Sequence, residues 1–188
     1  MNVRPATAAD IGYCERLDSS YATEYVWQVD ELTTADTIGV TMRRARIPRR
    51  IEVVYPRGTQ TLYDDLERNE CFLVADDAGA LVGYLDMAVR RWQWQGWIKH
   101  LIVHRPYRRQ GIATLLMQSA ERWARDAVLR AIIAETQTKN DPATCLYTKL
   151  GFSFCGFIDR YYNNGDIGML YSLNLQRDGR VLAHPGGG

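Results

Sequence analysis

The sequence predicts an α+β layer fold, in which a mostly antiparallel, twisted central sheet is flanked by helices. Short apolar runs of strand length alternate with segments whose apolar residues recur every three to four positions, a spacing typical of amphipathic helices. Their order is a strand, helices, three or four strands, a helix, a strand, a helix and two strands. The turn-forming sequence Asp76-Asp77-Ala78-Gly79 indicates that two of the middle strands form an antiparallel hairpin.

Length and composition limit the class of protein. The chain has 188 residues, and we expect one domain over residues 1–175 and a flexible tail over 176–188. Lys+Arg 23 against Asp+Glu 22 argues against a protein built mainly to bind nucleic acid. Four scattered cysteines without a CxxC pair predict neither a metal site nor disulfides. No apolar run is long enough to span a membrane, so we expect a cytoplasmic location.

The N-terminal half is expected to contain short helices and a β-rich insertion. We expect a strand within residues 2–7 and a helix from there to about residue 22. Alternating apolar residues at 38–42 predict a strand, and the run 51–54 a second one, within an insertion over about residues 24–58. A short amphipathic helix within 59–69 and strands over 71–75 and 81–91 complete this half.

The stretch from Trp97 to Phe152 organises the rest of the chain. It begins with an apolar strand and continues through a loop into a helix, whose apolar face is formed by Ile112, Leu115, Leu116, Ser119, Ala120, Trp123 and Ala124. Gly111 lets the loop backbone approach a ligand closely, and the N–H groups of the first helical turn and the helix dipole favour an anion there. Arg108 and Arg109 add positive charge, so the loop is predicted to bind a pyrophosphate.

Two segments of this stretch resemble a known family. The loop Arg108-Arg109-Gln110-Gly111-Ile112-Ala113 resembles the Gln/Arg-x-x-Gly-x-Gly/Ala signature of the GNAT N-acetyltransferases. The segment from Asn140 to Phe152 resembles the second block of that family, Asn-x-x-Ala-x-x-x-Tyr-x-x-x-Gly-Phe, and a strand over 129–135 separates the two. The resemblance implies the acyl-CoA N-acyltransferase fold and transfer of an acetyl group from acetyl-CoA to an amine, without a metal.

The resemblance also implies which residues contact the coenzyme. In the family, the strand before the glycine loop stabilises the oxyanion and holds the pantetheine arm with its backbone. Asn140 is expected to fix the loop near that arm or to cap the next helix, and Thr114 to add a hydroxyl to the phosphate contacts. The implied coenzyme-binding residues are Leu101, Ile102, Val103, Arg108, Arg109, Gln110, Gly111, Ile112, Ala113, Thr114, Asn140 and Tyr147.

Two residues are candidates for proton transfer. The tyrosine of the second block is Tyr147, whose phenol is protonated at neutral pH and suits a general acid for the departing thiolate. Glu135, at the end of an apolar strand, resembles the base of the ribosomal-protein alanine acetyltransferases of this family. It acts either as the base or as a positioning residue for the cationic acceptor. Where many relatives have an acidic residue before the glycine loop, this chain has Lys99 and His100.

The acceptor amine stays open at this stage. The triplet from Glu135 to Gln137 and the later Tyr161 or Tyr162 resemble streptothricin and other antibiotic acetyltransferases. The acidic residues between Asp18 and Asp36 favour a small cationic acceptor, and the insertion 24–58 is expected to shape the acceptor pocket or a homodimer contact. The alternatives are a protein N-terminal acetyltransferase and a non-catalytic acyl-CoA-binding protein.

Overall fold

The structure is a computed structural model that describes residues 1–59, 61–68 and 70–176. A seven-stranded sheet has the order β1-β4-β5-β6-β7-β9-β8, and β2 and β3 form a separate two-stranded sheet. The elements are β1 Asn2–Pro5, α1 Ala8–Cys14, β2 Tyr21–Thr33, β3 Ile38–Val53, α2 Leu62–Glu67, β4 Cys71–Asp77, β5 Ala80–Arg90, β6 Gln95–Val103, α3 Ile112–Asp126, β7 Ala131–Gln137, α4 Asp141–Lys149, β8 Ser153–Ile158 and β9 Gly168–Asn174.

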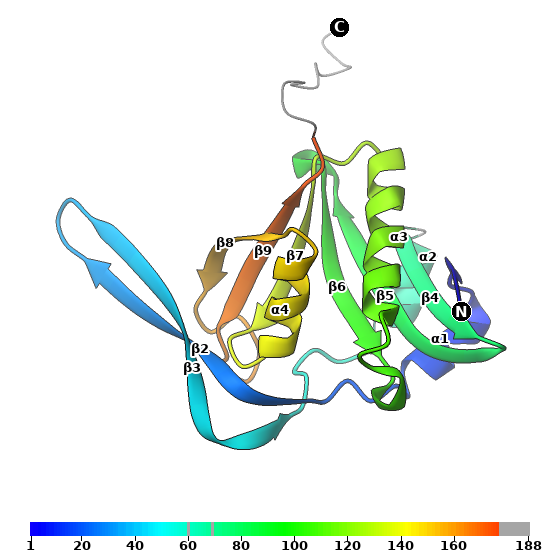
Figure 1. Ribbon diagram of the computed structural model, residues 1–188. Coiled ribbons are helices and arrows are strands. Elements are labelled where there is room, and N and C mark those ends of the chain that lie inside the picture. The colour runs from blue at the N-terminus through cyan, green and yellow to red at the C-terminus, as the bar shows by residue number, and fades with distance from the viewer. Residues whose placement is uncertain (60, 69, 177–188) are drawn as a thin grey trace, which may run out of the picture.

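The central sheet is covered by helices on both faces (Figure 1). The apolar face of α3 packs with Leu85 of β5 and Ile132 of β7 in the larger core cluster. Ile11 of α1 and Leu62 of α2 pack with Tyr84 of β5 in a second cluster. Among the strands that the structure describes, β6 and β7 form the one parallel pair, so the predicted mostly antiparallel α+β class is confirmed.

The first helix is shorter than predicted, since α1 ends at Cys14 and Tyr21 already belongs to β2. Leu17 and Tyr21 continue the helical spacing, but the residues between them form a turn in which the Asp18 carboxylate accepts a hydrogen bond from the Ser20 N–H, 2.9 Å. Asp and Ser side chains compete with the helix in this way. The local turn therefore overrides the apolar period.

The predicted β-rich insertion is a long hairpin, which we call the arm. It consists of β2 and β3 and projects from the body of the molecule (Figure 1). The two strands predicted near 38–42 and 51–54 are one strand, β3. Its pairing with β2 is interrupted, because Tyr25 faces Arg46 whereas Thr23 faces Ile51. Pro48 lies in this interruption and has no N–H to donate to a ladder.

The parallel pair β6–β7 separates partway along its length. Pairing runs from Gln95 opposite Ala131 to Ile98 opposite Ala134 and then ends, although each strand continues and stays paired with its other neighbour. At the same level the register between β5 and β6 shifts, so that Lys99 is an extra residue in β6. Because a bulge bends the strand that contains it, β6 turns away from β7 here. The sheet opens toward the carboxyl ends of both strands.

The expected flexible tail over 176–188 lies outside the described residues, except for Gln176. No helix among the residues that the structure describes is long and apolar enough to cross a membrane.

Candidate active site

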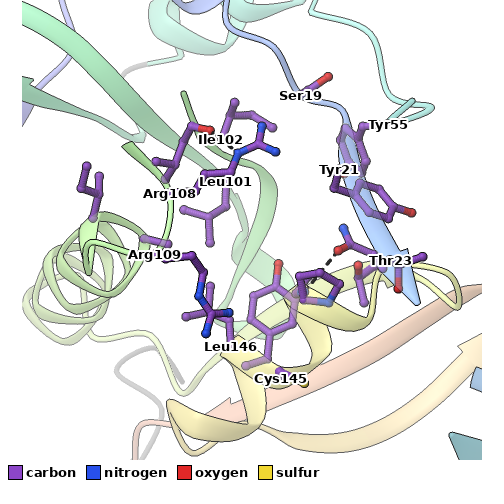
Figure 2. A pocket seen from close by; sticks show the side chains of 18 of the residues that line it. Ser19, Tyr21, Thr23, Tyr55, Leu101, Ile102, Arg108, Arg109, Cys145 and Leu146 are labelled. Atoms are coloured by element: carbon purple, nitrogen blue, oxygen red, sulfur yellow. Dashed lines mark hydrogen bonds between the residues drawn. The ribbon is translucent and has the colours of Figure 1, made fainter. Parts of the chain in front are cut away.

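The opening between β6 and β7 contains a cavity of about 760 Å³. Its walls are the ends of both strands, the glycine loop with the start of α3, one side of α4, and the base of the arm. Figure 2 shows Leu101 and Ile102 of β6, Arg109 of the loop and Leu146 of α4 around this space, with Tyr21 opposite them. Glu135 and every predicted coenzyme residue except Gln110 line it.

The glycine loop ends in a geometry that suits a bound anion. Gly111 is the N-cap residue of α3 and has φ +86°, and a Cβ built there would meet no atom within 4 Å. The first helical bond runs from the Leu115 N–H to the Gly111 carbonyl, 3.0 Å, so the earlier N–H groups of α3 have no acceptor within the helix. These donors and the dipole of a 15-residue helix face the loop.

Arg108 is placed differently from our expectation. Its guanidinium donates to the carbonyl of Val103, 2.8 Å, and to the carbonyls of Ser20 and Asp18, each 2.6 Å. These three bonds tie the segment before β2 to the end of β6. The side chain lines the cavity but serves as a structural clamp, because its donors are directed at backbone oxygens.

The next two residues, Arg109 and Gln110, differ in where their side chains lie. Arg109 lines the cavity next to the start of α3, with φ +67°. The Gln110 side-chain amide donates to the Pro106 carbonyl, 3.2 Å, which stabilises the preceding turn outside the cavity. Of the three polar residues of the loop, Arg109 is therefore the one available to a ligand in the cavity.

Tyr147 is held rigidly by the core while it lines the cavity. Its residue exposure is 4%, and its ring packs against Phe152 and Tyr171 with centroid distances of 5.6 and 5.8 Å. Burial raises the pKa of its phenol, so that the hydroxyl stays protonated at neutral pH. Nearby, the Asn140 side chain accepts from the Ala143 N–H, 3.2 Å, as the cap of α4, and Asn140 also lines the cavity.

Glu135 is a buried carboxylate with two partners. Its side chain is 3% exposed, one oxygen pairs with the Arg57 guanidinium, and the other accepts a hydrogen bond from the Tyr161 hydroxyl. Burial raises the pKa of the Glu135 carboxyl, and Arg57 opposes that rise. Our sequence analysis placed Arg57 near the end of the insertion over about residues 24–58 and gave it no role. Nothing in its local sequence marks it, since it approaches Glu135 only through the fold.

Lys99 and His100 of β6 are placed differently from each other, since Lys99 lines the cavity and His100 does not. His100 is 2% exposed, and burial together with Arg57 and Lys99 lowers its pKa to about 4, so that it is neutral at physiological pH. Lys99 lines the cavity, and its ammonium pairs with the buried carboxylate of Asp65. Asp86 lies 3.7 Å from the same ammonium.

The arm contributes the wall opposite the glycine loop. The residues from Tyr21 to Glu24 line the cavity, and the Tyr21 hydroxyl donates to Gln137 Oε1, 2.8 Å. Of the acidic residues between 18 and 36 that we expected at the acceptor site, Glu24 alone lines this cavity. Asp30 instead pairs with Arg43 farther along the arm, 2.8 Å.

The described part of the chain contains no group of three or more His, Cys, Asp or Glu side chains arranged to hold a metal ion.

The chain matches a family model described as the Acetyltransferase (GNAT) family over residues 40–152. A streptothricin acetyltransferase of Streptomyces lavendulae is 27% identical over 164 residues, which cover 85% of this chain and 85% of the relative. N-alpha-acetyltransferase 30 of Schizosaccharomyces pombe is 35% identical over 79 residues, which cover 42% of this chain and 53% of the relative.

Solved structures show the same fold. A nourseothricin acetyltransferase superimposes with a TM-score of 0.79 at 23% identity, covering 93% of this chain and 98% of that chain. A protein of Bacillus anthracis str. Ames in complex with acetyl coenzyme A gives a TM-score of 0.73 at 19% identity, with 92% and 96% covered. The family model spans more than half of the chain, and its relatives are named acetyltransferases. The chain therefore belongs to the Acetyltransferase (GNAT) family and is an acyltransferase.

Proposed function

We propose that this acyltransferase moves the acetyl group of acetyl-CoA to a primary amine of a small cationic acceptor. The observation that carries the proposal is that one cavity joins the glycine loop, the separated ends of β6 and β7, and both Tyr147 and Glu135. A phosphate site, a free strand edge and two proton-transfer groups are the parts that thioester aminolysis needs.

The coenzyme is expected to lie along β6 with its pyrophosphate on the glycine loop. The N–H groups at the start of α3, together with Arg109 and the Thr114 hydroxyl, are the donors for the pyrophosphate. Beyond Ile98, the edge of β6 that faced β7 has no partner strand among the described residues, so both backbone groups of Leu101 and the N–H of Val103 are available to the amides of the pantetheine arm. The bound coenzyme supplies the activated thioester.

The chemical step moves two protons. The neutral amine attacks the thioester carbonyl carbon, the C–S bond breaks, and the leaving thiolate takes a proton from the Tyr147 hydroxyl. The amine nitrogen loses a proton, for which the Glu135 carboxylate is the acceptor, directly or through water. Tyr147 then regains a proton from solvent and the Glu135 carboxylic acid releases its proton to solvent, so the enzyme is unchanged after each turnover.

Two observations favour a small cationic acceptor over a peptide. Glu24 brings a carboxylate to the cavity wall, which suits a positively charged amine. The streptothricin acetyltransferase of Streptomyces lavendulae aligns over most of this chain, whereas the N-alpha-acetyltransferase of Schizosaccharomyces pombe aligns over less than half. The second candidate, protein N-terminal acetylation, is supported by the higher identity of that shorter match.

A thiol-release assay with acetyl-CoA and a panel of amines tests the proposal. The panel contains streptothricin, aminoglycosides, polyamines and short peptides with free N-termini, and a reaction without enzyme gives the background. We expect rapid release of the coenzyme thiol with a small polycationic amine and little release with peptides. Turnover of peptides alone would favour the second candidate, and no turnover of any amine, with coenzyme binding intact, would contradict the proposed reaction.

A further inference from the structure

Glu135 sits in an enclosure that three distant segments of the chain build together. It lies in the second half of β7, Arg57 comes from the connection between β3 and α2, and Tyr161 comes from the connection between β8 and β9. Arg57 and Tyr161 each contact a different oxygen of the Glu135 carboxylate, so both oxygens are held. The carboxylate therefore has a fixed orientation at the cavity wall.

The position of Tyr161 depends on a glycine. A Cβ built on Gly168, at the start of β9, would lie 2.7 to 2.9 Å from the ring and Cβ atoms of Tyr161. Any side chain at position 168 would therefore displace the ring. Tyr162 packs against the Tyr161 ring at 5.1 Å with an interplanar angle of 86°. Gly168 and Tyr162 both pack on the Tyr161 side chain, and its hydroxyl is directed at Glu135.

The charges around Glu135 determine its protonation state. A carboxylate this deeply buried is protonated at neutral pH unless a partner stabilises the charge. The Arg57 guanidinium and the Tyr161 hydroxyl both stabilise the ionised form, and Arg90 adds a weaker attraction. The other titratable groups that face the carboxylate are the hydroxyls of Tyr55, Tyr147 and Tyr162, all with pKa values raised by burial.

We propose that Arg57 and Tyr161 are positioning residues that keep Glu135 ionised and oriented as the proton acceptor for the amine. This inference rests on the proposed function. In this arrangement the Glu135 carboxylate accepts the proton that the amine nitrogen loses as the amide forms, which leaves a neutral carboxylic acid, and the acid then releases its proton to solvent. Because Arg57 already balances the charge of Glu135, the carboxylate does not stabilise the ammonium form of the acceptor strongly.

The pH dependence of kcat/KM tests whether Arg57 and Tyr161 keep Glu135 ionised. Arg57→Met removes the cation, so the pKa of Glu135 should rise and the acid limb should move to higher pH, by about one unit or more. Arg57→Lys keeps the charge and should restore most of the wild-type profile. Tyr161→Phe and Gly168→Ala should shift the limb in the same direction by a smaller amount, because each removes one hydrogen bond. Arg49→Met, an exposed arginine of β3 outside the cavity, is the matched control.

A second readout does not need turnover. The glutamate Cδ carbons can be followed by ¹³C NMR, with Glu135→Gln used to assign the Glu135 signal. We expect its titration to move to higher pH in Arg57→Met and to return in Arg57→Lys. Identical Glu135 titrations and identical acid limbs in wild type, Arg57→Met and Tyr161→Phe would overturn the inference. If no amine is acetylated, the proposed function fails, and the NMR titration still decides whether Arg57 holds Glu135 ionised.

Discussion

At the scale of single residues, the packing role of Tyr147 and its proposed role as general acid can be separated by one substitution. Tyr147→Phe keeps the ring that packs on Phe152 and Tyr171 and removes the hydroxyl. We expect kcat to fall by roughly 10²-fold or more, the usual scale for a lost general acid, while coenzyme affinity stays close to wild type. Steady-state kinetics and calorimetry with acetyl-CoA check this. An unchanged kcat would show that the thiolate leaves without Tyr147.

A second residue-scale prediction concerns Asp86. Burial and the nearby Asp65 carboxylate raise the pKa of Asp86 to about 7, from an ordinary value of 3.8. The folded state then holds a proton that the unfolded state releases, so this contribution to stability is complete below about pH 4 and is lost as pH rises through about 7. Asp86→Asn does not titrate. The free energy of unfolding of Asp86→Asn, measured with urea, should therefore increase relative to that of wild type as pH rises from about 4 to about 7. Parallel pH dependences of the unfolding free energies of wild type and Asp86→Asn would contradict this prediction.

The residues that line the cavity were largely predictable, whereas their partners were not. The glycine loop and the block around Tyr147 are continuous segments, so their spacing can be read directly from the sequence. Arg57 and Tyr161 reach Glu135 across 78 and 26 residues of sequence, and both lie outside helices and strands. The direction of the Arg108 side chain was also unpredictable, because its acceptors are backbone carbonyls of a distant turn.

At the scale of elements, the arm divides into a base at the cavity and an exposed outer part. Glu24 lines the cavity, and Asp30 lies on the outer part. We expect Glu24→Gln to raise the acceptor KM for cationic amines and to leave the coenzyme KM unchanged, because one carboxylate is removed from the acceptor side. Asp30→Asn is the matched control and should change neither constant. A raised coenzyme KM in Glu24→Gln would place this residue on the coenzyme side.

The elements were predicted well where one periodicity dominates and poorly where turn chemistry interrupts it. The period of α3 is continuous, and the helix begins at Ile112 as predicted. Around Asp18 the apolar spacing persists while the turn ends the helical region. We predicted two strands from the apolar runs at 38–42 and 51–54, but β3 is one strand because β2 pairs with it on both sides of the interruption.

At the scale of the whole molecule, coenzyme binding should stabilise the fold through the glycine loop. A ligand that binds only the native state raises the melting temperature, and Gly111→Asp should abolish that rise because a carboxylate would meet the pyrophosphate. Gly79→Asp is the control, since Gly79 lies in the β4–β5 turn with a positive φ and a Cβ built there would also meet no atom within 4 Å. Both variants place a side chain in the same unfavourable backbone region. Equal coenzyme-induced shifts in the two would contradict the assignment of the loop.

The separation of β6 and β7 also has a consequence for how the molecule opens in solution. Four residue pairs join the two strands, from Gln95 opposite Ala131 to Ile98 opposite Ala134, whereas the neighbouring ladders are longer. Amide hydrogens of β6 and β7 past this short ladder should exchange with deuterated solvent faster than those of β5. A coenzyme lying along β6 would protect them, so hydrogen exchange with and without acetyl-CoA should show slowing concentrated at residues 99–103. The half of the sheet beyond the opening would then be a locally unstable region that acetyl-CoA stabilises when it binds.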